Sequence, residues 1–366
     1  MSFSCGFVGL PNVGKSTLFN ALSKGSAESA NFPFCTIEPN TGTVPVPDPR
    51  LKVLADLESS KEIIPSTLKF IDIAGLVKGA SEGQGLGNQF LGHIRSVDAV
   101  AHVVRVFEDP DVIHVDGKIN PVEDLEVIMT ELMLADMEML ERRLEKNKKL
   151  MRSNDPDIKL EMELTQQFAK QLENGQRPDF NREDKRQQAV VKQLGLLTVM
   201  PAFICANVDE ENFRQFGKND ATKELIEYAA NHNMEVVPVC AKLEEELSQL
   251  DPEEAEVFLE DLGVSETGLT RVIHTGYRLL NYITFFTAGP KETRAWTVTK
   301  GTPAPEASGK IHTDLCRGFI RMEVVSYDEM VTNGGWNKAQ SAGKLRIEGK
   351  DYIVQDGDVI HVRFSV

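Results

Sequence analysis

Nine residues near the start of the chain, GLPNVGKST at positions 9–17, constrain its fold more than any other stretch. They match the pattern G-x-x-x-x-G-K-[ST] at every fixed position. A short apolar run, residues 3–8, comes before them, and an apolar segment with helical periodicity, residues 18–22, follows. The pattern therefore predicts a glycine-rich loop between a buried strand and a helix, which is the context in which such a loop binds phosphate groups.

The residue types of this loop suit the triphosphate of a nucleotide. Glycine lets the backbone come close to phosphate oxygens, and successive backbone amides can point at them. Lys15 would place its charge on the β- and γ-phosphates, where it is a catalytic candidate, and Ser16 would offer its hydroxyl to Mg²⁺. We predict nucleotide contacts from Asn12, Val13, Gly14, Lys15, Ser16 and Thr17.

Composition limits the class of protein. A chain of 366 residues is long enough for two or three domains, and its hydrophobic fraction of 41% is ordinary for a globular protein. No run approaches the ~18 apolar residues of a membrane helix, and the N-terminus lacks the pattern of a secretory signal. The five cysteines are scattered without a C-x-x-C pair. We therefore expect a cytoplasmic protein with reduced thiols, no zinc site and no membrane partner.

Charge is distributed unevenly along the chain. The formal net charge is −16. Residues 283–366 hold 11 Lys and Arg and 10 Asp and Glu, a net of +1, whereas residues 1–282 hold 29 and 46, a net of −17. An acidic body is a poor general nucleic-acid binder, so we expect no DNA partner and RNA contact only through local basic patches. The candidate basic face, which is equally explained as a solvated surface, consists of Lys310, His312, Arg317, Arg321, Lys344, Arg346 and Lys350.

Two later segments supply candidates for the rest of a magnesium and phosphate site. NFPFCTIEPN at 31–40 has no helical or strand period, so we predict a loop in which Thr36 is a second Mg²⁺ ligand, although it can also be an ordinary loop threonine. Residues 68–75 form an apolar run that predicts a strand ending in Asp72, which can hold Mg²⁺ through water. The amide of Gly75 can then meet the γ-phosphate.

Leu76 stands where many P-loop GTPases carry the glutamine that orients the attacking water. Leucine cannot hydrogen-bond water, so either hydrolysis is slow or another group makes that contact. His114, in the polar segment 108–121, is the candidate for this catalytic role, and an ordinary loop histidine is at least as good an interpretation.

The hydrophobic period changes after residue 122. Side chains recur at alternating spacings of four and three, at Met133, Met137, Leu140, Leu144, Asn147 and Met151, within a strongly charged sequence. NDPD at 154–157 interrupts the repeat, and a second amphipathic stretch covers 160–172. We predict an antiparallel helical hairpin inserted in the nucleotide-binding domain, whose role is either structural or that of an arm for a partner.

Two further predicted strands, 197–206 and 234–239, are each followed by candidates for the base pocket. Asn207, Val208 and Glu210 occupy the place of the guanine-reading N-K-x-D motif, and Cys240 and Ala241 that of S-A-K. Glu210 is one methylene longer than aspartate and Val208 has no long stem, so guanine selectivity should be eroded. Asn207 can still bond a base, as asparagine commonly does with adenine.

Together these motifs make the chain similar to the Obg-like ATPase family of translation-factor-related P-loop proteins, of the YchF type. The similarity also includes DIAGLVKGASEGQGLGNQFL at 72–91, TAGPKETRAWTV at 287–298, GKIHTDLCRGFIR at 309–321 and GKDYIVQDGDVIHVRF at 349–364. It implies ATP and Mg²⁺ as cofactors, a preference for ATP over GTP, hydrolysis without the usual glutamine, and association with the ribosome.

We therefore predict an α/β fold: a P-loop NTPase (G-domain) with a doubly wound, mostly parallel sheet, an inserted α-helical hairpin, and a C-terminal β-grasp (TGS) domain. The predicted boundaries are 1–125 and 197–282 for the G domain, 126–196 for the hairpin and 283–366 for the TGS domain. We expect a monomeric Mg²⁺-dependent ATPase that regulates translation or stress on the large ribosomal subunit, with RNA contacts from the TGS domain and hairpin. The alternatives are a GTPase with relaxed base specificity, or a ribosome- or RNA-binding module in which hydrolysis is incidental.

Overall fold

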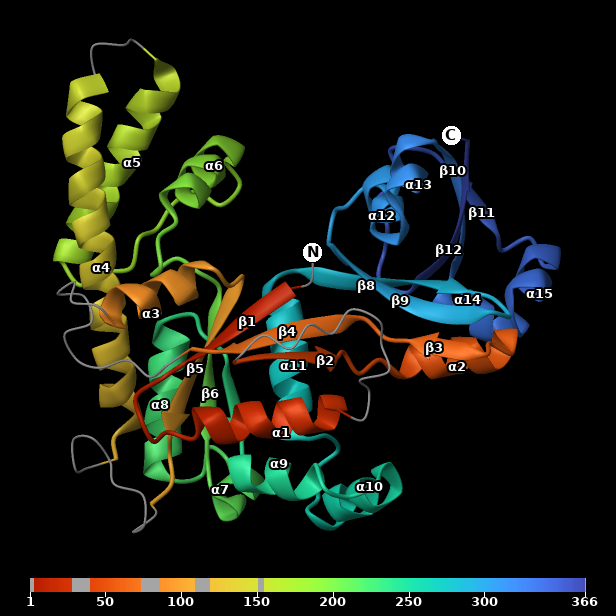
Figure 1. The fold of residues 1–366 in the computed structure, drawn as a ribbon, viewed down its shortest axis with the longest axis horizontal. Helices are drawn as coiled ribbons and strands as arrows, with labels where there is room; N and C mark the ends of the chain where they lie inside the picture. The colour runs from red at the N-terminus through yellow and green to blue at the C-terminus, as the bar shows by residue number, and fades with distance from the viewer. Residues whose placement is uncertain (1–2, 28–39, 74–85, 109–118, 151–154, 366) are drawn as a thin grey trace. The chain divides into compact units, whose positions relative to one another are not determined.

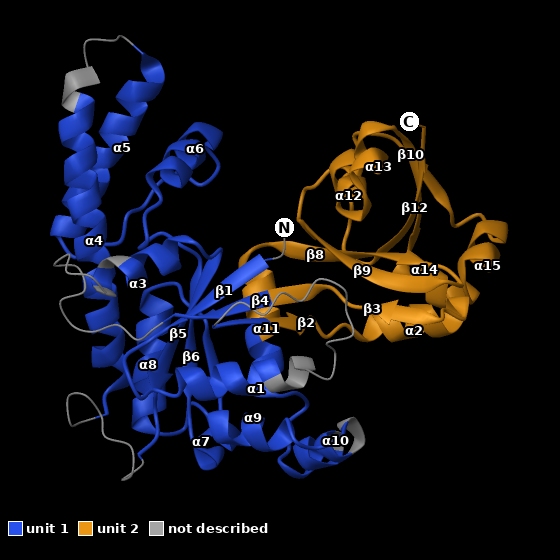
Figure 2. Ribbon diagram, viewed as in Figure 1, with its two compact units in different colours: residues 1, 3–42, 69–272 blue, residues 2, 43–68, 273–366 orange. Residues whose placement is uncertain are grey.

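A computed structural model describes residues 3–27, 40–73, 86–108, 119–150 and 155–365 of the chain (Figure 1). These residues form two compact units (Figure 2). The first contains residues 3–42 and 69–272, and the second contains 43–68 and 273–366. The second unit therefore combines the C-terminal region with a segment from the first fifth of the chain. No helix among the described residues is long and apolar enough to cross a membrane.

A six-stranded sheet in the order β2-β4-β1-β5-β6-β7 organises the first unit, although residues 43–45 of β2 and 67–68 of β4 are assigned to the second. Its strands are β1 Phe3–Val8, β2 Thr41–Pro45, β4 Thr67–Asp72, β5 Ala99–Arg105, β6 Ala202–Asn207 and β7 Val236–Val239. β1, β5, β6 and β7 run parallel, and every residue of β1 and β5 is buried, as expected when helices cover both faces of a parallel sheet. The predicted doubly wound, mostly parallel sheet is thus confirmed.

Ten helices that begin among the described residues of the first unit lie between these strands or follow the last of them. They are α1 Lys15–Ala27, α3 Leu86–Arg95, α4 Pro121–Leu150, α5 Pro156–Glu173, α6 Lys185–Leu194, α7 Glu210–Arg214, α8 Asp220–Asn231, α9 Ala241–Leu247, α10 Pro252–Asp261 and α11 Gly268–Leu279. The last of these, α11, runs from the first unit into the second.

The predicted pair of long helices is present as α4 and α5, which lie side by side (Figure 1). Leu140, Leu164 and Phe168 are buried between them, in a cluster that α6 completes. Asn147, the polar member of the repeat, is buried and donates to Glu161 Oε1 at 2.9 Å. A buried polar pair of this kind fixes the register of two packed helices.

β6 begins at Ala202, five residues later than the apolar run predicted. The amides of Leu197 and Thr198 do not join the sheet, because they donate to the carboxylate of Asp136 at 2.9 and 2.8 Å. The Thr198 hydroxyl donates to the same carboxylate at 2.6 Å. Asp136 lies on α4 and is fully buried, and this burial raises its pKa. The carboxylate thus ties the long helix to the segment that leads into β6.

A second six-stranded sheet, in the order β11-β10-β12-β8-β9-β3, organises the second unit. Its strands are β3 Glu62–Ile64, β8 Tyr282–Ala288, β9 Glu292–Thr299, β10 Phe319–Ser326, β11 Arg346–Glu348 and β12 Asp358–Phe364. Its helices are α2 Pro49–Glu58, α12 Ala304–Ile311, α13 Thr313–Arg317, α14 Tyr327–Asn333 and α15 Trp336–Ser341. β8–β9 and β10–β12 are antiparallel pairs, whereas β12–β8 and β3–β9 are parallel.

Two hydrophobic cores cover the two faces of this mixed sheet. One contains Phe286, Trp336 and, from the early segment, Leu51 and Leu54 of α2. The other contains Phe285 and residues of α12. Local sequence patterns gave no indication that α2 and β3 belong with strands more than 200 residues later, since each is too short to carry a distinctive period.

The stretch between β9 and β10 forms two short helices, α12 and α13. His312 between them is extended, with φ −159°, and its ring accepts a hydrogen bond from the Asp314 amide at 3.2 Å. β12 begins at Asp358, directly after a turn in which Gly357 takes a positive φ of 85°.

Candidate nucleotide-binding site

The predicted phosphate loop joins β1 to α1, and its backbone turns sharply through two residues in the left-handed region. Asn12 and Gly14 adopt positive φ values of 62° and 93°. Lys15 folds back over the loop, and its ammonium donates to the carbonyls of Gly9 at 2.9 Å and Leu10 at 2.7 Å. Burial lowers the pKa of Lys15 to about 8, although nearby Asp72 favours the charged form. The loop therefore presents a desolvated cation at the start of a helix, where anions bind.

Asn207 connects this loop to the second predicted nucleotide loop. Its amide nitrogen donates to the Val13 carbonyl at 2.9 Å, and its amide oxygen accepts from the Ala241 amide at 3.1 Å. The approach is so close that a Cβ at Gly14 would lie 2.1 Å from the Asn207 amide nitrogen. Glycine is thus required at 14 by its dihedral angle and by this contact. Asn207 was expected to bond a base, and its side chain here also holds the two loops in register.

Ser16 and Asp72, both predicted to hold magnesium, lie together. The Ser16 hydroxyl donates to Asp72 Oδ2 at 3.1 Å. Asp72 Oδ1 is buried and has no hydrogen-bond partner among the described residues. Burial raises the pKa of Asp72, and the Ser16 hydroxyl and Lys15 oppose that shift. A hydroxyl beside a carboxylate oxygen that lacks a partner fits a hard cation that binds oxygen ligands and water. The described residues contain no cluster of three or more His, Cys, Asp or Glu that would suit another kind of metal.

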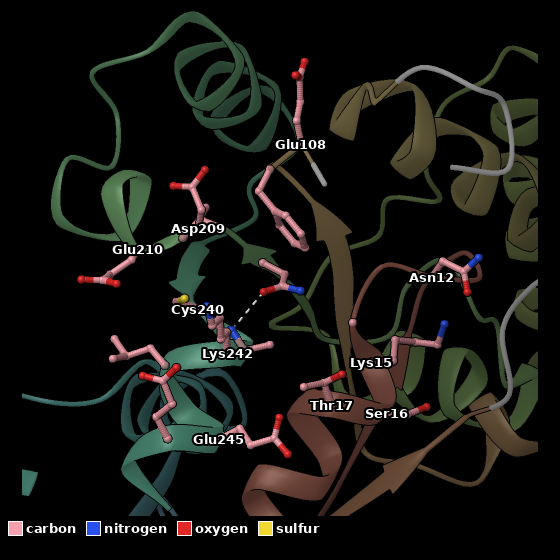
Figure 3. Close-up of a pocket in the computed structure, with 17 residues that line it drawn as sticks. Asn12, Lys15, Ser16, Thr17, Glu108, Asp209, Glu210, Cys240, Lys242 and Glu245 are labelled. Carbon is pink, nitrogen blue, oxygen red and sulfur yellow. Dashed lines mark hydrogen bonds between the residues drawn. The ribbon is translucent and has the colours of Figure 1, made fainter. Parts of the chain in front are cut away.

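A cleft of about 690 Å³ joins these features (Figure 3). Lys15 and Ser16 lie on one side of it, and Glu210 and Cys240 lie on the other. Val208 and Ala241 also line the cleft, as do Asn12, Gly14, Thr17 and Asn207. Of the described candidate residues, Val13 and Asp72 do not line it, since Val13 is fully buried and Asp72 lies behind the Ser16 hydroxyl that it accepts from.

The carboxylate of Glu210 has a partner of its own. It accepts from Arg214 Nη2 at 2.6 Å, one turn along α7, and its side chain is 57% exposed. An exposed ion pair of this kind contributes little stabilisation, so it does not hold the Glu210 carboxylate in one position. Cys240 caps α9 without a side-chain hydrogen bond, and burial raises the pKa of its thiol.

Several cleft residues were not predicted from the sequence, namely Phe107, Glu108, Asp209, Lys242, Leu243, Glu245 and Glu246. Phe107 lies two residues after the end of β5, at the carboxyl edge of the sheet. That position was the available signal, because ligands of doubly wound sheets bind at this edge. Three predicted residues, Thr36, Gly75 and His114, lie outside the described part of the chain, as does Leu76.

The doubly wound sheet, the phosphate loop and the paired second loop define a P-loop nucleotide-binding protein. A family model described as "50S ribosome-binding GTPase" matches residues 4–146, and one described as "Protein of unknown function (DUF933)" matches residues 282–365.

Relatives match the whole chain. Proteins named "Ribosome-binding ATPase YchF" from Haemophilus ducreyi and Bacillus subtilis are 52% and 50% identical to it, with 100% of each chain covered. A solved structure of the Schizosaccharomyces pombe YchF GTPase matches with a TM-score of 0.89 at 36% identity, covering 99% of this chain and 98% of that one. The chain belongs to the YchF family, which confirms the resemblance noted in its motifs.

Proposed function

We propose that this protein is a Mg²⁺-dependent ATPase of the cytoplasm that prefers ATP to GTP and acts, as a monomer, as a nucleotide-dependent regulator on the ribosome. The observation that carries the proposal is that Lys15 and Ser16 line one end of a cleft, with Asp72 bonded to the Ser16 hydroxyl, and that the altered base motif lines the other end. The names of the relatives, which describe a ribosome-binding ATPase, support the same activity.

Catalysis in this proposal consists mainly of positioning and electrostatic stabilisation. Lys15 and the amides of the loop stabilise charge on the transferring phosphoryl group. Ser16, Asp72 and Thr36 would hold Mg²⁺, which neutralises charge on the β- and γ-phosphates when it is bound. Leu76 cannot orient water, so His114 remains the proposed residue for that contact, and turnover is slow until a partner completes the site.

The preference for ATP rests on the base end of the cleft. A guanine site needs a carboxylate held against two N–H donors of the base, whereas the Glu210 carboxylate is largely exposed and pairs with Arg214. Phe107 offers an aromatic wall that accepts any base by stacking. A pocket with a movable carboxylate and an aromatic wall therefore lacks the selection for guanine, which is a condition for the proposed preference for ATP.

The ribosome is the proposed partner, with the α4–α5 hairpin and the second unit as contact regions. Several residues of the predicted basic face are already paired with acids. Lys344 lies 3.0 Å from Glu329, Arg346 lies 3.3 Å from Asp358, and Arg321 lies 3.6 Å from Glu323. The positive charge left for RNA is thus smaller than the sequence count suggested, and large-subunit binding would need further contacts from the hairpin.

Calorimetric titration of the nucleotide-free protein with ATP and with GTP, both with Mg²⁺, tests the proposal. We expect ATP to bind at least ~10-fold more tightly, a difference of about 1.4 kcal/mol. Tighter binding of GTP would instead identify a GTPase in which Glu210 substitutes for aspartate. Pelleting of Lys15→Ala protein with ribosomes tests the partner: full binding without nucleotide would favour a docking module with incidental hydrolysis.

A further inference from the structure

Arg105 is the largest fully buried side chain among the described residues. It is the last residue of β5 and is only 1% exposed. Arginine is almost never buried so completely unless it is paired. In the sheet it lies opposite Asn207, the residue that bridges the two nucleotide loops. A buried guanidinium therefore lies beside the nucleotide cleft but does not line it.

The side chain of Arg105 contacts Phe107, two positions later in the chain. Its Nε donates to the Phe107 carbonyl at 3.0 Å, and its guanidinium carbon lies 4.7 Å from the centre of the Phe107 ring. The hydrogen bond fixes the backbone of Phe107, and the cation–π contact fixes the ring. Between them, the Val106 amide donates to the Asn207 carbonyl at 2.9 Å. The turn at 105–107 is thus attached to the base motif as well.

Phe107 is the only aromatic residue among the described residues that line the cleft. It is half-buried and shares the cleft with Val208 and Ala241, whose side chains are much smaller. Stacking on an aromatic ring is available to every base, because every base has a π-face. The orientation of this ring therefore decides how well a base is held, whereas the triphosphate depends on the loop around Lys15.

We propose that Arg105 is a positioning residue for the nucleobase: it holds Phe107 as a rigid stacking wall and so sets the contribution of the base to nucleotide affinity. This inference rests on the proposed function, since it needs a nucleotide in the cleft. Arg105 does not line the cleft, so in this proposal it acts on the base through its two contacts with Phe107.

The test compares a ligand that has a base with one that lacks it. Mg·ATP and Mg·tripolyphosphate are titrated into the wild type, Arg105→Met, Phe107→Leu and the double variant. We expect each single variant to bind ATP about tenfold more weakly and tripolyphosphate within twofold of the wild type. The double variant should bind ATP no more weakly than Phe107→Leu alone, because both changes act on one ring.

Arg177→Met is the matched control. Arg177 is also a largely buried arginine that donates to a backbone carbonyl, that of Thr198, at 2.9 Å, but it does not line or adjoin the cleft. It should leave the ratio of the two affinities unchanged. If Arg105→Met does not fold, Arg105→Lys keeps the charge without the planar guanidinium and should show the same selective loss.

Equal losses for ATP and tripolyphosphate in the Arg105 variants, or additive losses in the double variant, would overturn the inference and leave the proposed function standing. If the wild type binds tripolyphosphate as tightly as ATP, the cleft does not hold a base. In that case both this inference and the proposed function would fail.

Discussion

Lys15 is the residue whose protonation the fold controls most directly at the phosphate end of the cleft. Its ammonium is held by the Gly9 and Leu10 carbonyls, yet desolvation still lowers its pKa to about 8. A bound triphosphate would place negative charge beside it and favour the charged form. Binding and protonation of this one side chain are therefore linked.

We predict that ATP binding takes up a proton at alkaline pH. Above pH ~8 the free protein holds Lys15 partly neutral, whereas the complex holds it charged, so affinity should fall as pH rises above 8, by up to ~10-fold per pH unit. Calorimetry at pH 9 in two buffers of different ionisation enthalpy measures the proton directly.

Lys15→Arg is the control, because arginine stays charged throughout this range and should abolish the proton uptake. Identical heats in the two buffers with the wild-type protein would show that Lys15 is already fully charged before ATP binds.

Site residues could be predicted where one local motif specifies them. Lys15 and Ser16 belong to a single loop, and Asp72 ends an apolar strand, so the structure places them as expected. Phe107 and Arg105 belong to no motif. Their roles depend on a contact across the turn after β5 and on the neighbouring strand, which a one-dimensional pattern does not contain.

At the scale of elements, one buried carboxylate ties α4 to the segment that leads into β6. Asp136 accepts three hydrogen bonds from Leu197 and Thr198, all of them buried. The apolar run from 197 predicts a strand. A local sequence pattern cannot show that the amides of Leu197 and Thr198 donate instead to a buried carboxylate on a helix 61 residues earlier. The start of β6 was therefore predicted too early, although the strand itself was correct.

We predict that Asp136→Ala costs about 3 kcal/mol or more of unfolding free energy, since it leaves two buried amides without an acceptor. Urea unfolding followed by circular dichroism measures this loss. Asp136→Asn keeps one carbonyl acceptor and should lose less.

Asp157→Ala is the matched control on the neighbouring helix. Its side chain is 83% exposed and forms an ion pair with Arg186, which is also exposed, so its removal should change stability by well under 1 kcal/mol. Equal losses for Asp136→Ala and Asp157→Ala would show that the buried anchor contributes nothing special.

At the scale of the whole molecule, the second unit is built from two separate parts of the chain. Residues 43–68 supply α2 and β3, and β3 pairs with β9 from Glu62 opposite Glu292. Leu51 and Leu54 are 5% and 0% exposed in the core around Phe286. Burial of each leucine contributes about 1.5–3 kcal/mol, a large part of the 5–15 kcal/mol that stabilises a typical domain.

We predict that a fragment of residues 273–366 alone does not fold cooperatively, because one of its two cores lacks α2. Thermal melts followed by circular dichroism should show a broad transition. Addition of a peptide of residues 43–68 should restore a sharp one and bind the fragment.

A peptide in which Leu51 and Leu54 are both alanine is the control and should restore nothing. A sharp melt of the fragment without any peptide would show that residues 283–366, the predicted TGS domain, hold together without the early segment.

Because the second unit is built from two distant segments, its parts are synthesised at different times. Residues 43–68 leave the ribosome early. The strand that pairs with β3, namely β9, follows about 230 residues later. At 5–20 residues per second, the apolar face of α2 waits roughly 10–50 seconds for its partners. During that interval the nascent chain carries two leucines that have no native core to enter, and it is in this window that a chaperone holding residues 43–68 would improve the yield of folded protein.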